Sequence, residues 1–162
     1  MIRNKNVTLL RVLLAAVLAL TAMPKAHAES LIVEAESFSK RGGWVVDQQF
    51  MDIMGSPYLI AHGMGVPVSD AVTTVNINSG GTYHVYVRTY NWTSPWTTKP
   101  GAGAFEVSVG GKRLRTVGQT GNRWQWQKAG TVRLKAGATQ LRLHDLTGFD
   151  GRCDAILLTT DG

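Results

Sequence analysis

The chain has 162 residues, of which 44% are hydrophobic and 17% are charged. This composition supplies enough apolar side chains for one packed domain and too little charge for a disordered segment. The formal charge of +6 is typical of a nucleic-acid-binding protein, but four of the 17 basic residues precede residue 29 and no acidic residue does. Without these four, 13 basic and 11 acidic residues leave +2, which argues against nucleic acid as a partner.

The first 28 residues have the organisation of a secretory signal peptide. Three basic residues precede an apolar run from Val12 to Met23, and Ala26-His27-Ala28 forms a small-x-small cleavage site. The run is shorter than the ~20 residues that span a bilayer, which disfavours the alternative of an uncleaved anchor. We therefore expect a signal peptide over residues 1–28 and a secreted or periplasmic bacterial protein that comprises residues 29–162, with no membrane span after cleavage.

Nearly every segment after residue 29 has the two-residue hydrophobic period of a β-strand, and almost none has the 3.6-residue period of a helix. In chain order, the predicted strands are Leu31–Glu36, Trp44–Gln48, Ala71–Ile77, Gly81–Tyr90, Phe105–Val109, Lys112–Val117, Gln125–Leu134 with a break near Gly130, Leu141–His144 and Ala155–Thr159. A helical turn fits well only over Phe50–Met54. Roughly nine short antiparallel strands with glycine turns between them predict an all-β fold, a single jelly-roll β-sandwich.

Cys153 is the only cysteine of the chain. An oxidising destination therefore cannot give an internal disulfide, and the fold must depend on core packing or on a metal ion. We interpret Cys153 as a small buried hydrophobic residue.

Aromatic residues gather in and around the one long segment without strand character, Asn91–Gly103. An exposed indole ring matches the apolar C–H face of a sugar, so aromatic side chains beside polar groups favour saccharide recognition, with core packing as the alternative. Trp124 and Trp126 share a strand face, so at least one of them is expected in the core. The predicted ligand-binding residues are Tyr90, Trp92, Trp96, Trp126 and Asp150.

No arrangement of nucleophile, base and orienting acid is visible. The chain lacks a Gly-x-Ser-x-Gly elbow, and the adjacent His144 and Asp145 must point to opposite faces of a strand. The sequence therefore favours binding without catalysis.

Glu34 and Glu36 are two residues apart on the first predicted strand and so share a face. Two carboxylates side by side are unfavourable unless water or a cation screens them, and calcium binds several such oxygens. Asp154, at the start of the last predicted strand, is the third candidate ligand. The spacing leaves two interpretations open, a structural calcium site and solvated surface acids.

Five segments occur in the order found in carbohydrate-binding modules of families 6 and 35. They are Val33–Glu36, Gly81–Arg88, Val107–Gly111, Ala136–Leu141 and Cys153–Ile156. The chain resembles these modules over nearly all of residues 29–162. The resemblance implies a galactose-binding-like β-sandwich that binds sugars without catalysis and holds structural calcium with first-strand glutamates and a last-strand aspartate, positions occupied here by Glu34, Glu36 and Asp154.

A closer likeness involves four further segments, Gly43–Asp52, Gly55–Leu59, Ala61–Gly63 and Leu146–Asp154. These resemble the N-terminal module of secreted bacterial xanthan-lyase-like and FAD-dependent oxidoreductase proteins, in which a large catalytic domain follows the module. Two functions are therefore expected. One is a secreted module that recognises a polysaccharide or oligosaccharide through loop aromatics, and the other is an accessory domain that docks on the catalytic domain of a larger enzyme without binding glycan.

Overall fold

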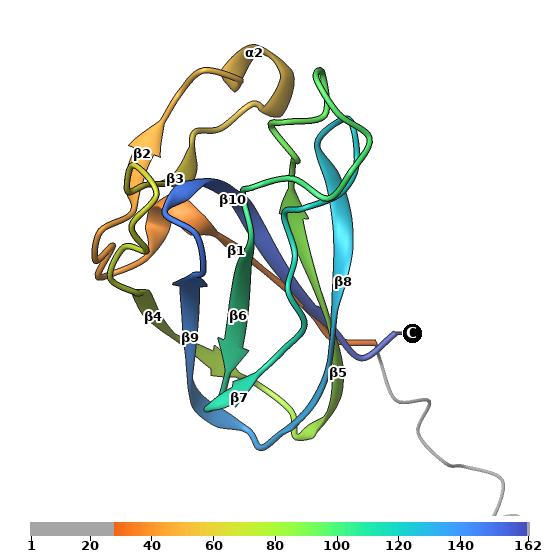
Figure 1. The fold of residues 1–162 in the computed structure, drawn as a ribbon. Helices are drawn as coiled ribbons and strands as arrows, with labels where there is room; N and C mark the ends of the chain where they lie inside the picture. The colour runs from red at the N-terminus through yellow and green to blue at the C-terminus, as the bar shows by residue number, and fades with distance from the viewer. Residues whose placement is uncertain (1–27, 162) are drawn as a thin grey trace, which may run out of the picture.

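The computed structural model describes residues 28–161, and Figure 1 shows two antiparallel sheets packed face to face. This arrangement confirms the predicted all-β sandwich. Residues 1–27, and with them nearly all of the predicted signal peptide, lie outside the described part of the chain. Within residues 28–161, no helix is long and apolar enough to cross a membrane.

Ten strands, one short helix and one 3-10 turn make up the sandwich. In chain order they are β1 (Ser30–Glu34), η1 (Ala35–Ser37), β2 (Val45–Asp47), α2 (Met51–Met54), β3 (Tyr58–His62), β4 (Ala71–Ile77), β5 (Gly81–Thr89), β6 (Phe105–Val109), β7 (Lys112–Arg113), β8 (Gln125–Leu134), β9 (Gly137–Asp145) and β10 (Phe149–Thr159). The larger sheet has the order β2-β3-β10-β5-β8, with β1 also paired to β10. The smaller sheet has the order β4-β9-β6-β7.

Most predicted strands and the helical turn are confirmed. β4, β6 and β8 begin and end where the periodicity placed them, and α2 occupies the predicted turn. The predicted break near Gly130 is a β-bulge, because Val85 pairs with Gly130 while Tyr86 pairs with Lys128. Gly130 has a φ of 151°, which explains why a glycine stands there.

Three strand predictions need correction. β3 was not predicted, because Tyr58, Leu59, Ile60 and Ala61 are all buried and give no alternation. β10 begins at Phe149 rather than Ala155, and its first half was missed because it contains Gly151 and the buried charged residues Arg152 and Asp154. β7 ends at Arg113, after which the chain crosses toward β8, where the Arg115 N–H donates to the Ala129 carbonyl.

The core lies between the two sheets and follows from the alternation along each strand. In β5, Tyr83, Val85 and Val87 are fully buried and face the smaller sheet across the sandwich. Trp44 meets Phe105 edge to face, with ring centroids 5.5 Å apart. Cys153 is buried as predicted, and burial raises the pKa of its thiol well above the ordinary value.

The loops that could form a site gather at one end of the sandwich, the upper end in Figure 1. They are the segments between β2 and β3, β3 and β4, β5 and β6, and β9 and β10. The short turns between β4 and β5, β6 and β7, and β8 and β9 lie at the opposite end. Rigid strands thus present a set of longer loops, which is the usual arrangement for a binding site.

Candidate functional site

The long loop after β5 begins with a turn that Asn91 holds in place. The buried Asn91 side chain accepts hydrogen bonds from the Thr93 N–H (3.1 Å) and the Thr93 hydroxyl (2.7 Å). This Asx turn fixes the position of Trp92, and a backbone hydrogen bond from Trp96 to Thr93 continues the turn. The loop is therefore ordered by its own polar side chains.

Three aromatic rings from two loops form one surface, here called the aromatic platform (Trp92, Trp96 and Phe149). Trp92 stacks on Phe149 with centroids 5.4 Å apart, and its indole N–H donates to the Phe149 carbonyl (3.0 Å). Trp96 meets Trp92 edge to face at 5.8 Å. Trp96 is 74% exposed and Phe149 is 43% exposed, so the platform presents apolar ring faces to solvent.

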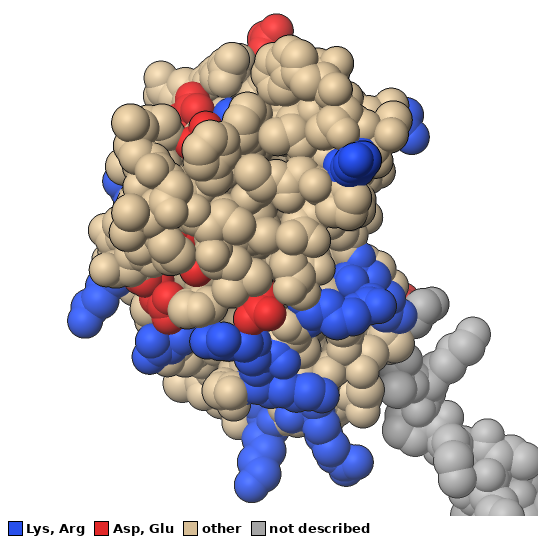
Figure 2. Space-filling view, in the orientation of Figure 1, with Lys and Arg blue, Asp and Glu red and all other residues tan. Residues whose placement is uncertain are grey.

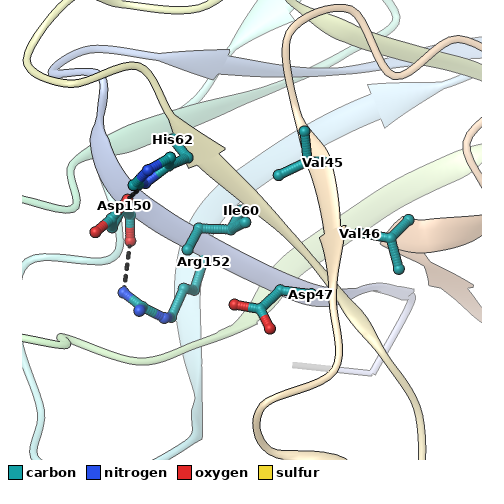
Figure 3. Close-up of a pocket in the computed structure, with 7 residues that line it drawn as sticks. All are labelled: Val45, Val46, Asp47, Ile60, His62, Asp150 and Arg152. Carbon is teal, nitrogen blue, oxygen red and sulfur yellow. Dashed lines mark hydrogen bonds and ion pairs between the residues drawn. The ribbon is translucent and has the colours of Figure 1, made fainter.

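A hollow of about 360 Å³ adjoins the platform and is drawn in Figure 3. Strands β2, β3 and β10 supply its lining, which is Val45, Val46, Asp47, Ile60, His62, Asp150 and Arg152. Its volume is at the lower end of the range of small-ligand sites (~300–1,000 Å³). Arg152 connects the hollow to the platform, because its guanidinium lies 5.8 Å from the Trp92 ring centroid.

Charged and polar groups line the rim of this hollow. His62 Nδ1 lies 2.6 Å from Asp150 Oδ1, and Arg152 Nη1 donates to the Asp150 carbonyl (2.9 Å), as Figure 3 shows. Arg152 is only 8% exposed, yet its Nε has no hydrogen-bond partner within residues 28–161. A buried donor without a partner is costly, so a ligand acceptor at this point would be stabilised.

Asp47 also lines the hollow, and the buried side chain of Tyr58 holds it in place. The Tyr58 hydroxyl donates to Asp47 Oδ2 (2.8 Å), and burial together with this hydrogen bond raises the pKa of Tyr58 to about 12. The tyrosine therefore stays protonated and leaves further acceptor capacity on the Asp47 carboxylate.

The turn that carries Phe149 and Asp150 is held rigidly. Buried Asp145 accepts hydrogen bonds from Thr147 and Gly148 at one carboxylate oxygen and from Val68 at the other. Asp150 has a φ of 59°, a left-handed conformation that a non-glycine residue adopts only at some cost. Asp150 lies at the rim of the hollow, and its left-handed backbone conformation sets the direction of its side chain there.

A second aromatic cluster lies beside the long loop and is more enclosed. It consists of Phe50, Tyr58, Tyr90 and Trp124, with Tyr58 and Trp124 centroids 4.9 Å apart. Next to it is a hollow of about 460 Å³ with a hydroxyl and amide lining from Asn91, Ser94, Thr97, Thr98, Pro100, Thr120, Gly121 and Asn122. Trp124 precedes β8 and is half-buried, and Trp126 is exposed, so the expectation that at least one of the two packs in the core is wrong.

The structure brings three of the five predicted ligand-binding residues together. Trp92, Trp96 and Asp150 lie on or beside the platform, whereas Tyr90 belongs to the second cluster. Trp126 stands on β8 opposite Arg88, exposed and outside every ring pair among the described residues.

Sequence reasoning missed two residues of the arrangement, His62 and Arg152. They lie on β3 and on the first half of β10, the segments that periodicity did not predict. These residues could have been found only if the two segments had been predicted as strands.

The three candidate calcium ligands come from neighbouring segments, but Glu36 lies in η1 rather than on the first strand, so the predicted same-face strand pair with Glu34 is wrong. β1 pairs with β10 so that Glu34 stands opposite Ala155, next to Asp154. Asp154 accepts from Arg88 Nη1 (3.1 Å) and from the Ser56 hydroxyl (3.4 Å), and one buried Glu36 oxygen, Oε2, has no partner. As placed, no three acidic, histidine or cysteine side chains within residues 28–161 lie close enough to form a metal site.

Burial determines the protonation of this acidic group. It raises the pKa of Asp154 to about 6, although Arg88 opposes the rise, and the charge on Glu34 adds to it. Burial also raises the pKa of Glu36, with smaller contributions from Glu34 and Asp154. Buried carboxylates with raised pKa values would gain from a cation, so the donor set fits calcium in chemistry.

No protein-family model and no curated protein matches the chain. Solved structures do match in fold, and the likeness to xanthan-lyase-like and FAD-dependent oxidoreductase modules stays a prediction. A family 35 carbohydrate-binding module from Clostridium thermocellum has a TM-score of 0.60 at 21% identity, with 80% of this chain and 97% of that one covered. A family 6 module of a laminarinase from Zobellia galactanivorans has a TM-score of 0.56 at 21% identity, with 82% and 100% covered.

A mannanase from Podospora anserina that carries a family 35 module also matches, with a TM-score of 0.62 at 18% identity. The match covers 80% of this chain but only 27% of the mannanase. At these identities the comparisons show the fold, the β-sandwich of family 6 and family 35 modules.

Proposed function

We propose that the chain is a secreted, non-catalytic carbohydrate-binding module and that its sugar site is the aromatic platform together with the adjoining hollow. The observation that carries the proposal is the position of buried Arg152, which lines the hollow with Asp150, has an unpartnered Nε and places its guanidinium group beside Trp92 of the platform. The shared fold with modules named as carbohydrate-binding supports the same function.

Recognition would divide between stacking and hydrogen bonding. The exposed face of Trp96 offers an apolar surface to the C–H face of a pyranose. Hydroxyl groups of the same sugar would donate to Asp150 and Asp47 and accept from Arg152, a combination that suits a hydroxyl because it both donates and accepts.

The test is a glycan array with residues 29–162, followed by titration of the best ligand. Trp96→Ala should weaken binding ten- to hundredfold, since loss of one stacked ring costs about 1 to 3 kcal/mol. Arg152→Met should weaken it by a similar factor while keeping much of the side-chain volume. Asn122→Ala, in the second hollow, is the matched control and should bind as wild type.

Two outcomes would overturn this assignment. Unchanged affinity in both Trp96→Ala and Arg152→Met would place the sugar elsewhere, and a weakened Asn122→Ala would place it in the second hollow.

A structural calcium ion is part of the proposal. Glu34, Glu36 and Asp154 would hold it, and the buried Glu36 oxygen without a partner supports this assignment. The ion would supply charge compensation for carboxylates that β1, η1 and β10 bring together, and no sugar contact is assigned to it.

The second candidate function is docking on a catalytic domain. Met64 and Val66 are strongly exposed on the loop after β3, and Gly63 and Gly65 of that loop donate to the Gly148 carbonyl beside Phe149. Exposed apolar side chains on adjoining loops are typical of protein contacts. A folded module that binds no glycan on the array would favour docking over sugar binding.

A further inference from the structure

Basic residues are distributed unevenly along the chain and over the surface. Residues 107–144 contain eight lysines and arginines and no acidic residue. Figure 2 shows that blue side chains gather over the lower part of the molecule, where β7 and the β8–β9 turn lie in Figure 1. This end is opposite the loops of the proposed sugar site.

The basic residues at this end come from both sheets. β7 is the edge strand of the smaller sheet and β8 is the edge strand of the larger one. Lys112 crosses from one to the other and donates through Nζ to the Thr131 carbonyl (2.9 Å), and Arg115 donates through Nη2 to the Lys128 carbonyl (2.8 Å). The two edges therefore meet in a seam that carries cations from both sheets.

We define the basic seam as five exposed residues, Lys112, Arg115, Lys128, Arg133 and Lys135. None of them lies within ion-pair distance of an acidic group among residues 28–161, whereas neighbouring Arg113 is paired with Glu106 (3.3 Å). Five unneutralised cations in one region repel one another, and an anionic ligand would relieve that repulsion.

The seam is also hollowed. A groove of about 400 Å³ is lined by Lys112, Arg113, Leu114, Arg115, Ala129, Gly130 and Thr131. The β8 bulge at Ala129 and Gly130 forms one wall of this groove. Lys128, an exposed residue of β8, places its ammonium group over the Tyr86 ring of neighbouring β5, 5.6 Å from the ring centroid.

We propose that the basic seam binds an anionic polysaccharide through its carboxylate or sulfate groups, as a second site that is independent of the aromatic platform. Lys128 and Arg133 are exposed positions of β8 and Lys135 follows the strand directly, so cations recur along this edge of the sheet. A linear acidic polysaccharide carries charged groups at intervals of one or more sugars, which suits such a row of cations. Duplex DNA carries one charge per ~1.7 Å and calls for a stronger positive field than a domain of charge +2 provides.

The binding test uses three polyanion probes and one vesicle probe with residues 29–162. Polygalacturonate offers carboxylates alone, heparin offers sulfates as well, and duplex DNA and phosphatidylglycerol vesicles represent the two other classes of anionic partner. We expect submillimolar binding to at least one of the two polysaccharides that is lost as salt rises toward ~1 M, where charges are screened beyond ~3 Å. The preferred polysaccharide identifies which acidic group is recognised.

Variants locate the interaction. Lys112→Gln/Arg115→Gln/Lys128→Gln should reduce polysaccharide affinity about tenfold or more at low salt, as expected for three exposed charge contacts. The control Lys40→Gln/Lys99→Gln/Arg123→Gln removes the same charge from other exposed positions and should bind as wild type. If the triple variant is unstable, Arg133→Gln/Lys135→Gln replaces it, because neither side chain makes a hydrogen bond among the described residues. This double variant should also bind the polysaccharide more weakly than wild type.

Three results would overturn the proposal. They are no binding to either polysaccharide, equal losses in the seam and control variants, and binding to DNA or vesicles as tight as to the polysaccharides. Trp96→Ala should leave binding of the acidic polysaccharide unchanged. The proposal for the basic seam can therefore be refuted without refuting the proposal for the aromatic platform.

Discussion

The tryptophans of the long loop show how the surroundings of a single residue determine its role. Trp96 projects into solvent and contacts only the edge of Trp92 among the aromatic rings. Trp92 is instead fixed by a stacked ring, a hydrogen bond and a cation. The sequence predicted the same exposed role for both, whereas the structure separates a solvent-facing ring from the ring that supports it.

We expect Trp92→Ala to lower the free energy of unfolding by about 2 kcal/mol, because an aromatic pair and a hydrogen bond contribute about 1 kcal/mol each. Trp92→Phe should recover roughly half of the loss, since it keeps the stacking and removes the indole N–H. Trp96→Ala should change stability by less than ~0.5 kcal/mol. Urea unfolding followed by circular dichroism measures all three, and equal losses for Trp92→Ala and Trp96→Ala would contradict the separation.

Buried Asp154 predicts a pH dependence of stability in the presence of chelator. The pKa of Asp154 is about 6 in the folded state against an ordinary value of 3.8, so between these values only the folded state holds the proton. The contribution is fully present below pH ~4 and is lost as pH rises through ~6, on the order of 2 kcal/mol. Asp154→Asn should flatten this slope in urea titrations between pH 4 and 7, and an equal slope in the variant would exclude Asp154 as its source.

Calcium should reverse this loss if the acidic trio binds it. The ion binds the folded state, so at a hundredfold excess over Kd it would add about 2.7 kcal/mol to the free energy of unfolding. Thermal melts at pH 7.5 should therefore fall by several degrees on addition of chelator. Glu36→Gln should lose most of the calcium effect, whereas Asp52→Asn, an exposed acid on α2, should keep it. Identical melts with and without calcium, in protein shown to be metal-free, would refute the site.

At the scale of elements, a strand could be predicted from the sequence when only one of its two faces is buried. β4, β5 and β6 have one buried and one open face, and their alternation predicts them almost residue for residue. β3 lies between β2 and β10, and aromatic side chains cover Tyr58 on its outer face, so it shows no period of two. The hollow of the candidate site is lined by this strand and by the first half of β10, and the hydrophobic period predicts neither segment, so His62 and Arg152 were not identified.

Charged residues in β10 concealed its first half for a related reason. Asp154 is buried because it pairs with Arg88 of β5, and Arg152 is buried beside Trp92 of the loop after β5. Such neighbours are set by the tertiary structure. Asp150 was identified because the glycines beside it suggested a loop, although it lies on the same first half of β10 as Arg152. Sequence reasoning therefore found an acidic residue beside glycines and missed the buried arginine two residues later.

The turn between β9 and β10 offers a test of how closely two site loops pack. Gly148 has a φ of 62°, and a Cβ there would lie 2.0 Å from the Val66 carbonyl oxygen. Gly148→Ala should therefore lower the free energy of unfolding by more than ~3 kcal/mol, the sum of strain and displacement. Gly111→Ala is the matched control, since its φ of 83° is equally left-handed but its Cβ would meet nothing within 4 Å.

Gly111→Ala should lower the free energy of unfolding by only about 1 kcal/mol, because it adds backbone strain without a clash. Both variants can be compared by urea unfolding. Equal losses would show that the loop after β3 moves away easily and does not support the Phe149 turn.

At the scale of the whole molecule, the two ends of the sandwich carry different chemistry. The platform, hollow and acidic residues 47 and 150 lie among the loops after β3 and β5, and the uncompensated cations lie toward the short turns. A single polysaccharide with neutral and acidic regions could contact both, and two separate ligands could bind at once. Competition between the best array glycan and the acidic polysaccharide distinguishes these cases.

We expect the exported protein to begin at Glu29. Within residues 28–161, Glu29 is the first residue hydrogen-bonded to the sandwich, because its N–H donates to the Thr160 hydroxyl (2.9 Å) and its carbonyl accepts from the Thr160 N–H (2.9 Å). Its side chain also accepts from Asn78 N–H (3.1 Å). Cleavage after Ala28 would therefore release the leader and leave every pairing of β1 intact, and intact mass of exported protein should correspond to residues 29–162.

Truncation measures the same boundary in vitro. Residues 29–162 should melt at the temperature of the exported protein, whereas residues 32–162 lack Ser30 and Leu31, two of the five register pairs of β1 with β10, and should melt several degrees lower. An exported protein that retains residues 1–28 would refute cleavage. Equal melting of the two truncated forms would show that the first pairs of β1 contribute nothing to stability, and the boundary would then rest on the mass alone.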